Sequence, residues 1–296
     1  MDSVSLRAPA KINLGLDVIG KREDGYHEVR MIMQSVHLYD RVDIKRTRSR
    51  AIRVETNLYY LPADENNLAY KAAKLLKDEF KIRDGVFITL QKFIPVAAGL
   101  AGGSADAAAV LIGMNRIFRL GLNQKQLMAF GRRIGADVPF CVMRGTALAE
   151  GIGEILTPLP SMPKCPVLIA KPAASVSTRW VYENLILTET TKHPDIDAIA
   201  DAVKKKNLKL TAENMGNILE TVTVPKNPVI EEIKRNMKAN GALNAIMSGS
   251  GPSVFGLFQN EKEIHRAYDA LKSSGLAKNL YATEIFTSGN RKQNRE

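Results

Sequence analysis

The chain has 296 residues, enough for two domains, and its 45% hydrophobic and 25% charged residues are typical of a globular protein. Its net charge of +11 is compatible with nucleic acid, a membrane surface or an anionic small molecule as partner. With only two cysteines and four histidines, the chain should have no disulfide framework and no zinc site, which favours a reducing, cytoplasmic compartment. It shows no basic stretch followed by an apolar one near its start and no long apolar run, so we expect no secretion signal and no membrane span.

The first half of the chain predicts strands interrupted by helices. Residues 10–18, 36–44 and 86–90 have the alternating or apolar pattern of strands. Residues 67–80 carry apolar side chains at helical spacing, with Asn66 or Asn67 as the N-cap. A second helix should begin with Ser104 as its cap, and a third should cover residues 123–134 and end at Gly135.

The second half begins after a proline-rich stretch, residues 157–166, which predicts a domain boundary. We therefore expect an N-terminal domain over residues 1–157 and a C-terminal domain over residues 164–296. The expected strands here are residues 167–170, 244–247, 254–258 and 281–287, with helical patterns up to about residue 240 and again over 264–273. Strands mixed with helices in both halves predict an α+β fold.

The segment Pro95–Asp106 carries the strongest functional signal. Its three glycines and four alanines leave the backbone open to a ligand, and it leads into a helix N-terminus, where free N–H groups favour phosphate. Ser104 adds a hydroxyl that can cap the helix, contact phosphate or hold a metal. The segment matches neither the Walker A pattern nor the dinucleotide fingerprint, and a tight packing turn is the alternative interpretation.

Two further features leave alternatives open. The small-residue loop Ser248–Ser253 is either a plain hairpin turn or a backbone nest for an anion. The basic clusters Lys45–Arg50, Lys204–Lys206 and Arg291–Lys292 are short and scattered, with no aromatic-rich strand beside them. They favour a solvated surface over a nucleic-acid site, with diffuse steering of an anionic substrate as the other role.

Several ordered segments resemble the GHMP kinase superfamily, which includes galactokinase, homoserine kinase and mevalonate kinase. They are Ala8–Leu14, Pro95–Ala105 and Asn244–Ser253. Three segments narrow the resemblance to one branch: Ala10–Leu14 together with Asp24–Glu28, and Gly135–Phe140. That branch phosphorylates the 2-hydroxyl of a cytidine diphosphate-linked methylerythritol, in the non-mevalonate route to isoprenoid precursors. The family's loop often continues Ser-Ser where this chain has Ala105, which weakens a second hydroxyl role and leaves the backbone cradle intact.

The resemblance covers nearly the whole chain and implies a two-domain GHMP kinase fold. Its N-terminal domain would be an α/β domain like ribosomal protein S5, its C-terminal domain an α/β sandwich, and its active site would lie in the cleft between them. It also implies ATP as co-substrate, Mg²⁺, and a small-molecule substrate carrying a cytidine diphosphate group. We expect no nucleic acid or membrane as partner, and a monomer or homodimer.

The resemblance further implies that Asp137 is the catalytic base, with Lys11 beside it. Phosphoryl transfer to an alcohol needs a group that accepts the hydroxyl proton, and a carboxylate beside an ammonium stays ionised. Lys11 would also offset charge on the phosphoryl oxygens. From the residues alone, Asp137 can equally be a turn residue and Lys11 a solvent-facing strand residue.

The remaining expected site residues fall into two groups. Those expected to bind ATP are Pro95, Val96, Ala97, Ala98, Gly99, Leu100, Ala101, Gly102, Gly103, Ser104 and Ala105, with Asn67 as a weaker candidate for the adenine pocket. Those expected to bind substrate are Asn13, Tyr26, His27, Thr178, Tyr182, Gly249, Ser250 and Gly251. Tyr26 and His27 would contact the cytosine by stacking and by hydrogen bonds, and spacing favours Tyr182 over Trp180 as the second stacking ring. No dedicated carboxylate cluster for the metal is visible.

Two other functions remain open. Another GHMP kinase, acting on homoserine, a sugar or mevalonate, would keep the fold and the phosphate loop and lack the cytosine site. A basic nucleic-acid-binding protein on the same fold would explain the charge of +11 and bind RNA in a salt-dependent way. The presence of both Lys11 and Asp137 argues against a role in binding alone.

Overall fold

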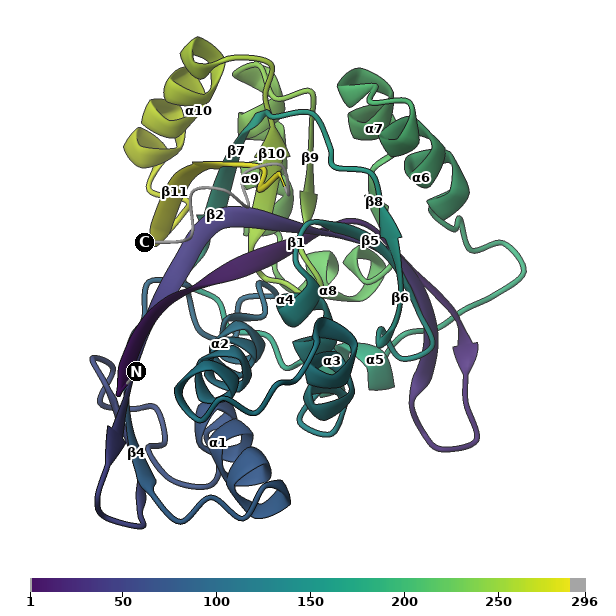
Figure 1. Cartoon of the computed structure of the whole chain (residues 1–296). Coiled ribbons are helices and arrows are strands. Elements are labelled where there is room, and N and C mark those ends of the chain that lie inside the picture. Colours follow the sequence, from purple (N-terminus) through teal and green to yellow (C-terminus); the bar gives the residue numbers. More distant parts are fainter. Residues whose placement is uncertain (1, 288–296) are drawn as a thin grey trace. The chain divides into compact units, whose positions relative to one another are not determined.

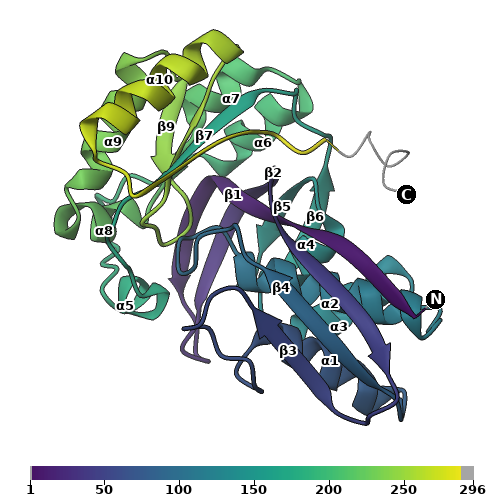
Figure 2. The same ribbon diagram turned by 90° about the vertical axis from the view of Figure 1, so that its left-hand side faces the viewer.

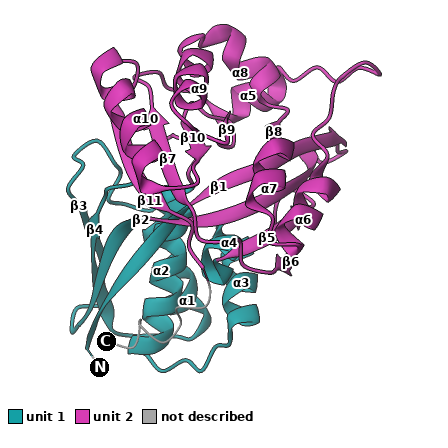
Figure 3. Cartoon of the chain, turned by 90° about the horizontal axis from the view of Figure 1, so that it is seen from above, with its two compact units in different colours: residues 1–10, 38–96, 101–144 teal, residues 11–37, 97–100, 145–296 magenta. Residues whose placement is uncertain are grey.

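The structure is a computed structural model and describes residues 2–287 (Figure 1). The Arg291–Lys292 cluster lies outside these residues. The chain forms two compact units, coloured separately in Figure 3. Unit 1 holds residues 1–10, 38–96 and 101–144, and unit 2 holds residues 11–37, 97–100 and 145–296. The long strands β1 (Ser3–Lys21) and β2 (His27–Thr47) contribute residues to both units.

Unit 1 is a sheet covered on one face by helices. Its further elements are β3 (Ile52–Thr56), α1 (Leu68–Glu79), β4 (Gly85–Gln91), α2 (Gly102–Ile117), α3 (Gln124–Arg132) and α4 (Val138–Met143). The strands follow the order β3-β4-β2-β1, with β4 parallel to β3 and antiparallel to β2, where Arg41 faces Gln91. Figure 2 shows α1 and α2 behind β3 and β4, and α2 also packs on α3 and α4.

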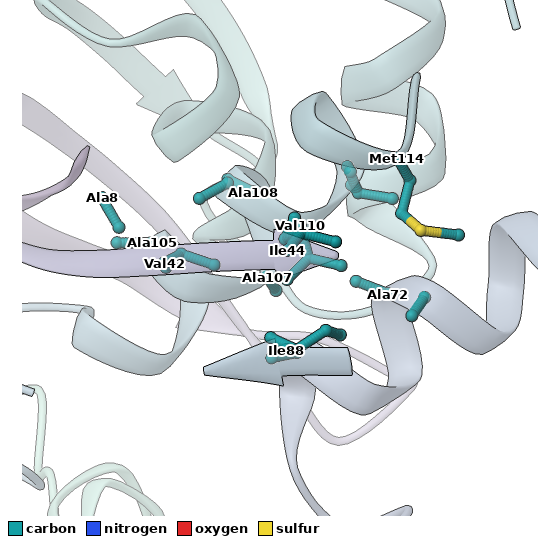
Figure 4. Packing of buried hydrophobic residues seen from close by; sticks show 14 of the residues in the cluster. Ala8, Val42, Ile44, Ala72, Ile88, Ala105, Ala107, Ala108, Val110 and Met114 are labelled. Carbon is teal, nitrogen blue, oxygen red and sulfur yellow. The ribbon is translucent and has the colours of Figure 1, made fainter. Parts of the chain in front are cut away.

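The core of unit 1 lies between this sheet and α2 (Figure 4). Val42, Ile44 and Ile88 point from the sheet towards the alanine-rich face of α2, and all are at most 1% exposed. Small side chains let the helix lie close to the strands: a Cβ at Gly113 would overlap Ile44. Burial of each large aliphatic side chain contributes about 2 kcal/mol, so the contact fixes α2, whose N-terminus follows the glycine-rich segment.

Unit 2 contains two groups of strands. Its further elements are β5 (Thr146–Glu150), β6 (Ile155–Leu159), β7 (Pro166–Lys171), α5 (Thr178–Glu183), α6 (Ile196–Lys204), α7 (Leu208–Asn214), β8 (Gly216–Asn217), α8 (Glu220–Lys226), α9 (Val229–Ala239), β9 (Asn244–Met247), β10 (Val254–Leu257), α10 (Glu261–Ser274) and β11 (Asn279–Glu284).

In the first group, β5 pairs antiparallel with residues 31–34 of β2 and with β6, while β8 pairs parallel with β1 at Gly15 and Leu16. The second group is an antiparallel sheet in the order β11-β7-β10-β9, on which α9 and α10 pack. Within residues 2–287, no helix has the length and apolar character needed to cross a membrane.

The mixed helix-and-strand architecture predicted from the sequence is confirmed, with corrections to individual elements. Asn67 caps α1 as expected. Ser104 is not the cap of α2: the helix begins at Gly102, and its N-cap is Ala101 in a left-handed conformation. Gly135 does not end α3, which stops at Arg132. Strands β3, β5 and β6 were not predicted, and β6 runs through the proline-rich stretch because Pro158 is tolerated on a strand paired on one side only.

Candidate active site

Lys11 and Asn13 form a buried polar pair on β1, in unit 2. Because alternate residues of a strand share a face, their side chains lie side by side, and Lys11 Nζ donates to Asn13 Oδ1 over 2.8 Å. Asn13 Nδ2 is directed to the sulfur of Met31 at 3.1 Å, so the amide oxygen is the atom that faces the lysine. The exposed fractions are 5% for Lys11 and 0% for Asn13. Lys11 is therefore no solvent-facing strand residue.

Gly99, from the glycine-rich segment, lies against the loop Ser248–Ser253, also in unit 2. Ser248 Oγ donates to the Gly99 carbonyl at 3.0 Å, and a Cβ at Gly99 would overlap the Ser248 carbonyl oxygen. The next residue, Leu100, accepts a hydrogen bond from the Lys11 N–H at 3.2 Å. A Cβ placed on Gly249 would lie 3.2 Å from the Gly99 oxygen and 3.5 Å from Lys11 Nζ. Part of the predicted ATP loop, Lys11 and the second glycine loop therefore come together.

The loop Ser248–Ser253 joins the antiparallel strands β9 and β10, so it is a hairpin connection. Gly249 and Gly251 have φ angles of +57° and +86°, which favour glycine, and Gly251 N–H donates to the Ser248 carbonyl at 3.0 Å. The Ser250 hydroxyl lies 2.8 Å from the hydroxyl of Thr178 at the start of α5. The predicted substrate residues Thr178, Gly249 and Ser250 are thus neighbours.

Two of the three rings expected to bind the nucleobase also meet in unit 2. The ring centroids of His27 and Tyr182 are 5.2 Å apart, and the rings are tilted by 38°. The neighbouring Tyr26 is 61% exposed, as a ring available to a ligand must be. Trp180 instead lies under the ammonium of Lys226, 4.5 Å from the ring centroid, and the choice of Tyr182 as the stacking ring stays a prediction. Burial, with the positive charge of Lys21, lowers the pKa of His27, so its imidazole is neutral near pH 7.

In unit 1, the N-terminus of α2 is open. Its N-cap, Ala101, has φ of 56° and supplies no side-chain hydrogen bond, and the first backbone bond of the helix is Ala105 N–H to Ala101 carbonyl at 2.9 Å. The N–H groups of Gly102, Gly103 and Ser104 therefore precede the first intrahelical bond and are not capped by the Ala101 side chain. An anion is the ligand that such a terminus prefers.

A buried charged triad, which the sequence did not reveal, lies beneath this helix start. Lys92 Nζ donates to Asp106 at 2.5 Å and to one carboxylate oxygen of Asp40. The other carboxylate oxygen of Asp40 accepts the N–H groups of Phe93 at 2.5 Å and Ile94 at 2.8 Å. Burial raises the pKa of Asp106 to about 7, although Lys92 lowers it, and Asp40 raises it further. In the sequence, Lys92 is a single lysine before a proline-containing loop and Asp106 an aspartate in an alanine-rich helix. No sequence pattern indicates that these two side chains form an ion pair.

Asp137 and Asn67, the other expected residues of unit 1, both precede helices. Asp137 is the half-buried N-cap of α4, and its main-chain carbonyl accepts the Cys141 N–H at 3.1 Å. Asn67 uses its amide to hold its own loop, since Oδ1 accepts the Ala69 N–H at 2.9 Å and Nδ2 donates to the Pro62 carbonyl at 2.8 Å. Its contact with adenine stays a prediction. Among residues 2–287 no group of three or more His, Cys, Asp or Glu side chains is placed to hold a metal ion.

Comparison with known protein families gives matches in both halves of the chain. The model of the N-terminal domain of GHMP kinases matches residues 67–145, and that of the C-terminal domain matches residues 199–277. The predicted boundary over residues 157–164 falls between the two matches and stays a prediction.

Individual relatives match over nearly the full length. A protein of Lachnospira eligens named 4-diphosphocytidyl-2-C-methyl-D-erythritol kinase is 56% identical over 97% of this chain and all of its own. A crystal structure of 4-(cytidine 5'-diphospho)-2C-methyl-D-erythritol kinase superposes with a TM-score of 0.81 at 33% identity, over 95% of this chain and 99% of the other. The homoserine kinase of Cytophaga hutchinsonii, at 21% identity over 97% and 95% of the two chains, has a TM-score of 0.79 and shares the fold. The chain therefore belongs to the GHMP kinases, the ATP-dependent kinases that its glycine-rich segment resembles, and within them to the family of 4-diphosphocytidyl-2-C-methyl-D-erythritol kinases.

Proposed function

We propose that the protein transfers the γ-phosphoryl group of ATP to the 2-hydroxyl of 4-diphosphocytidyl-2-C-methyl-D-erythritol, giving the 2-phosphate and ADP. The observation that carries this choice among GHMP kinases is the ring pair of His27 and Tyr182, 5.2 Å apart beside the exposed Tyr26. The acceptors of kinases that act on homoserine, a sugar or mevalonate contain no nucleobase, so those kinases need no base-binding site for the acceptor. The names of the relatives with high identity support the same substrate.

The cytosine would be held by stacking and by its hydrogen-bonding edge. An aromatic face contributes about 1–3 kcal/mol per stacked base. His27 suits the base edge because a neutral imidazole has one donor and one acceptor nitrogen, and its lowered pKa keeps it neutral. Tyr26 and Tyr182 supply the aromatic faces.

In the chemical step, the acceptor hydroxyl oxygen forms a bond to the γ-phosphorus while the bond from that phosphorus to the β-phosphate oxygen breaks and ADP leaves. Asp137 is proposed to accept the hydroxyl proton as general base. Lys11, whose ammonium is oriented by Asn13, would offset the negative charge on the phosphoryl oxygens. The side chains of Asp137 and Lys11 thus supply the general base and the positive charge that the chemical step needs.

The phosphates of ATP are proposed to lie along the glycine-rich segment from Pro95 to Ala105. The open first turn of α2 offers N–H donors, and the left-handed Ala101 directs the chain into it. Mg²⁺ would enter with ATP, bound to phosphate oxygens and water, and offset their charge. We place the reaction in the cytoplasm, in keeping with a chain that has only two cysteines, Cys141 and Cys165, both of them buried.

The experiment that tests this function is ADP release from Mg-ATP with a panel of acceptors. The panel is 4-diphosphocytidyl-2-C-methyl-D-erythritol, homoserine, galactose and mevalonate. We expect turnover with the cytidylyl acceptor alone. Activity on another acceptor would keep the kinase and discard the cytosine site. Steep, salt-dependent RNA binding without ATP turnover would instead support the nucleic-acid alternative.

A further inference from the structure

Asn217, the last residue of β8, holds the loop Ser248–Ser253 in place. Its Nδ2 donates to two carbonyl oxygens, of Met247 at 2.9 Å and of Gly249 at 2.8 Å. Its Oδ1 accepts the Leu219 N–H at 3.0 Å, and the residue is only 7% exposed. Each polar atom of this amide is therefore bonded to the main chain, and two of its bonds go to the loop and the residue just before it.

Two neighbours of Asn217 on α8 hold the same loop. Glu220 accepts the Met247 N–H at 2.6 Å with one oxygen and Lys234 Nζ at 2.6 Å with the other. Thr223 Oγ1 donates to the Ser250 carbonyl at 3.3 Å. The carbonyls of residues 247, 249 and 250 are thus all bound by side chains of residues 217–223, which leaves little freedom in the direction of the loop's peptide planes.

This arrangement determines where the loop's N–H groups point. In a trans peptide the C=O and N–H point in opposite directions, so the Ser250 N–H is directed away from Asn217. The Gly249 N–H lies opposite the Ser248 carbonyl, which accepts the Gly251 N–H. Within residues 2–287, no hydrogen bond is made by either the Gly249 or the Ser250 N–H. A Cβ on Gly249 would lie 3.5 Å from Lys11 Nζ.

Two free N–H groups beside an ammonium are donors that suit phosphate oxygens. We propose that Asn217 is a positioning residue: by binding the Met247 and Gly249 carbonyls, it presents the N–H groups of Gly249 and Ser250 to phosphate oxygens of the reactants. The inference rests on the proposed function, which supplies two sources of such oxygens. They are the diphosphate of the acceptor and the phosphoryl group in transfer.

The test compares Asn217→Ala with Asn244→Ala, a matched control. Asn244 also joins the main chain, because Nδ2 donates to the Ala212 carbonyl at 2.8 Å and Oδ1 accepts the Ala245 N–H at 2.9 Å, but it lies at the far end of β9 from the loop. For each protein, calorimetry measures the affinity for cytidine and for cytidine diphosphate, and steady-state assays measure kcat and both KM values. Circular dichroism identifies a temperature at which all variants are folded.

If the loop binds the acceptor diphosphate, Asn217→Ala should leave cytidine affinity unchanged and reduce the advantage of cytidine diphosphate over cytidine about tenfold. If it binds the phosphoryl group in transfer, that advantage should stay and kcat should fall about 100-fold. Either result supports the positioning role. The Asn244→Ala protein should stay within about twofold of wild type in every quantity.

The proposal is overturned if Asn217→Ala changes none of these quantities or changes them only as much as Asn244→Ala does. It is also overturned if Asn217→Ala weakens the affinities for cytidine and for cytidine diphosphate by the same factor. If Asn217→Ala does not fold, Asn217→Asp retains the acceptor for Leu219 and removes the two donors, with Asn244→Asp as its control and the same expected results. A wild-type protein without turnover on the cytidylyl acceptor contradicts the proposed function, and the nucleotide affinities still test the loop.

Discussion

At the scale of single residues, Asp137 occupies a position in which its charge can be removed without disturbing the helix it precedes. It is the N-cap of α4 and makes no capping hydrogen bond with its side chain, and asparagine caps a helix as well as aspartate does. A change to asparagine therefore removes the charge of the carboxylate and keeps a residue suited to the cap of α4.

We expect Asp137→Asn to lower kcat about 100-fold or more and to leave the KM for ATP within a few-fold of wild type, because a general base contributes mainly to the chemical step. Steady-state kinetics of ADP release measures both. The control is Asp195→Asn at the N-cap of α6, which should retain full activity. Turnover of Asp137→Asn near the wild-type value would remove this residue from the mechanism.

His27 gives the site a pH dependence of its own. Burial and Lys21 lower its pKa from 6.5, so the neutral imidazole persists somewhat below that pH and becomes charged on further acidification. Cytidine affinity, measured by calorimetry, should be constant from pH 8 to about 6.5 and fall at lower pH. His27→Gln should bind more weakly and without this fall. His265 is exposed on α10, and His265→Gln should show the same pH dependence as wild type. If cytidine affinity falls at low pH as much in His27→Gln as in wild type, a group other than His27 causes the fall.

At the scale of elements, the Lys92–Asp40–Asp106 triad joins the end of β4 to the start of α2. Between pH 3.8 and about 7, Asp106 is protonated in the folded state and ionised in the unfolded one, since burial raises its folded pKa. Folding then takes up a proton, so this group's contribution to stability falls as the pH rises through that range, by up to about 1.4 kcal/mol per pH unit.

We therefore expect Asp106→Asn to gain stability relative to wild type as the pH is raised from 5 to 7, with urea unfolding as the measurement. The neutral amide keeps an oxygen for Lys92 and has no charge to bury. Asp78→Asn, at an exposed position on α1, should follow the wild-type pH dependence. Parallel curves for Asp106→Asn and wild type would show that this carboxyl is ionised in the folded protein.

Much of the element order could be predicted from the sequence, because periodic apolar residues and asparagine caps leave local signals, as at Asn67. Strands β5 and β6 left none, since most side chains of β5 are short and β6 contains Pro158. The cap of α2 was misplaced because Ala101 adopts a left-handed conformation that alanine rarely takes. Ordered motifs led to Lys11, His27 and Gly249.

The residues that support the site could not be found in this way. Asn217 Nδ2 donates to residues 30 and 32 positions away, and Asp40 and Lys92 are 52 positions apart. No local periodicity relates such pairs, and a lone asparagine or lysine is usually a surface residue. Their roles follow from tertiary contacts alone.

At the scale of the whole molecule, the net charge of +11 should act on association. A positive protein attracts an anionic acceptor and ATP, and salt screens this attraction, since the Debye length falls from about 10 Å at 0.1 M to about 3 Å at 1 M. We expect kcat/KM for the cytidylyl acceptor to fall with ionic strength while kcat changes little. Replacing Lys204, Lys205 and Lys206 by glutamine should make kcat/KM less dependent on ionic strength. A wild-type kcat/KM that does not change with salt would contradict electrostatic attraction of the substrates.

The contact between Gly99 and the Ser248–Gly249 peptide is made largely of main-chain atoms, with no room for a side chain at residue 99. Substitution elsewhere could change this surface only by moving the loop itself, as Asn217→Ala is designed to do, and substitution at Gly99 would force the two loops apart. An inhibitor that took its hydrogen bonds from this part of the protein would therefore leave few routes to resistance. The mutations that displaced the drug would also displace the loops on which the enzyme depends.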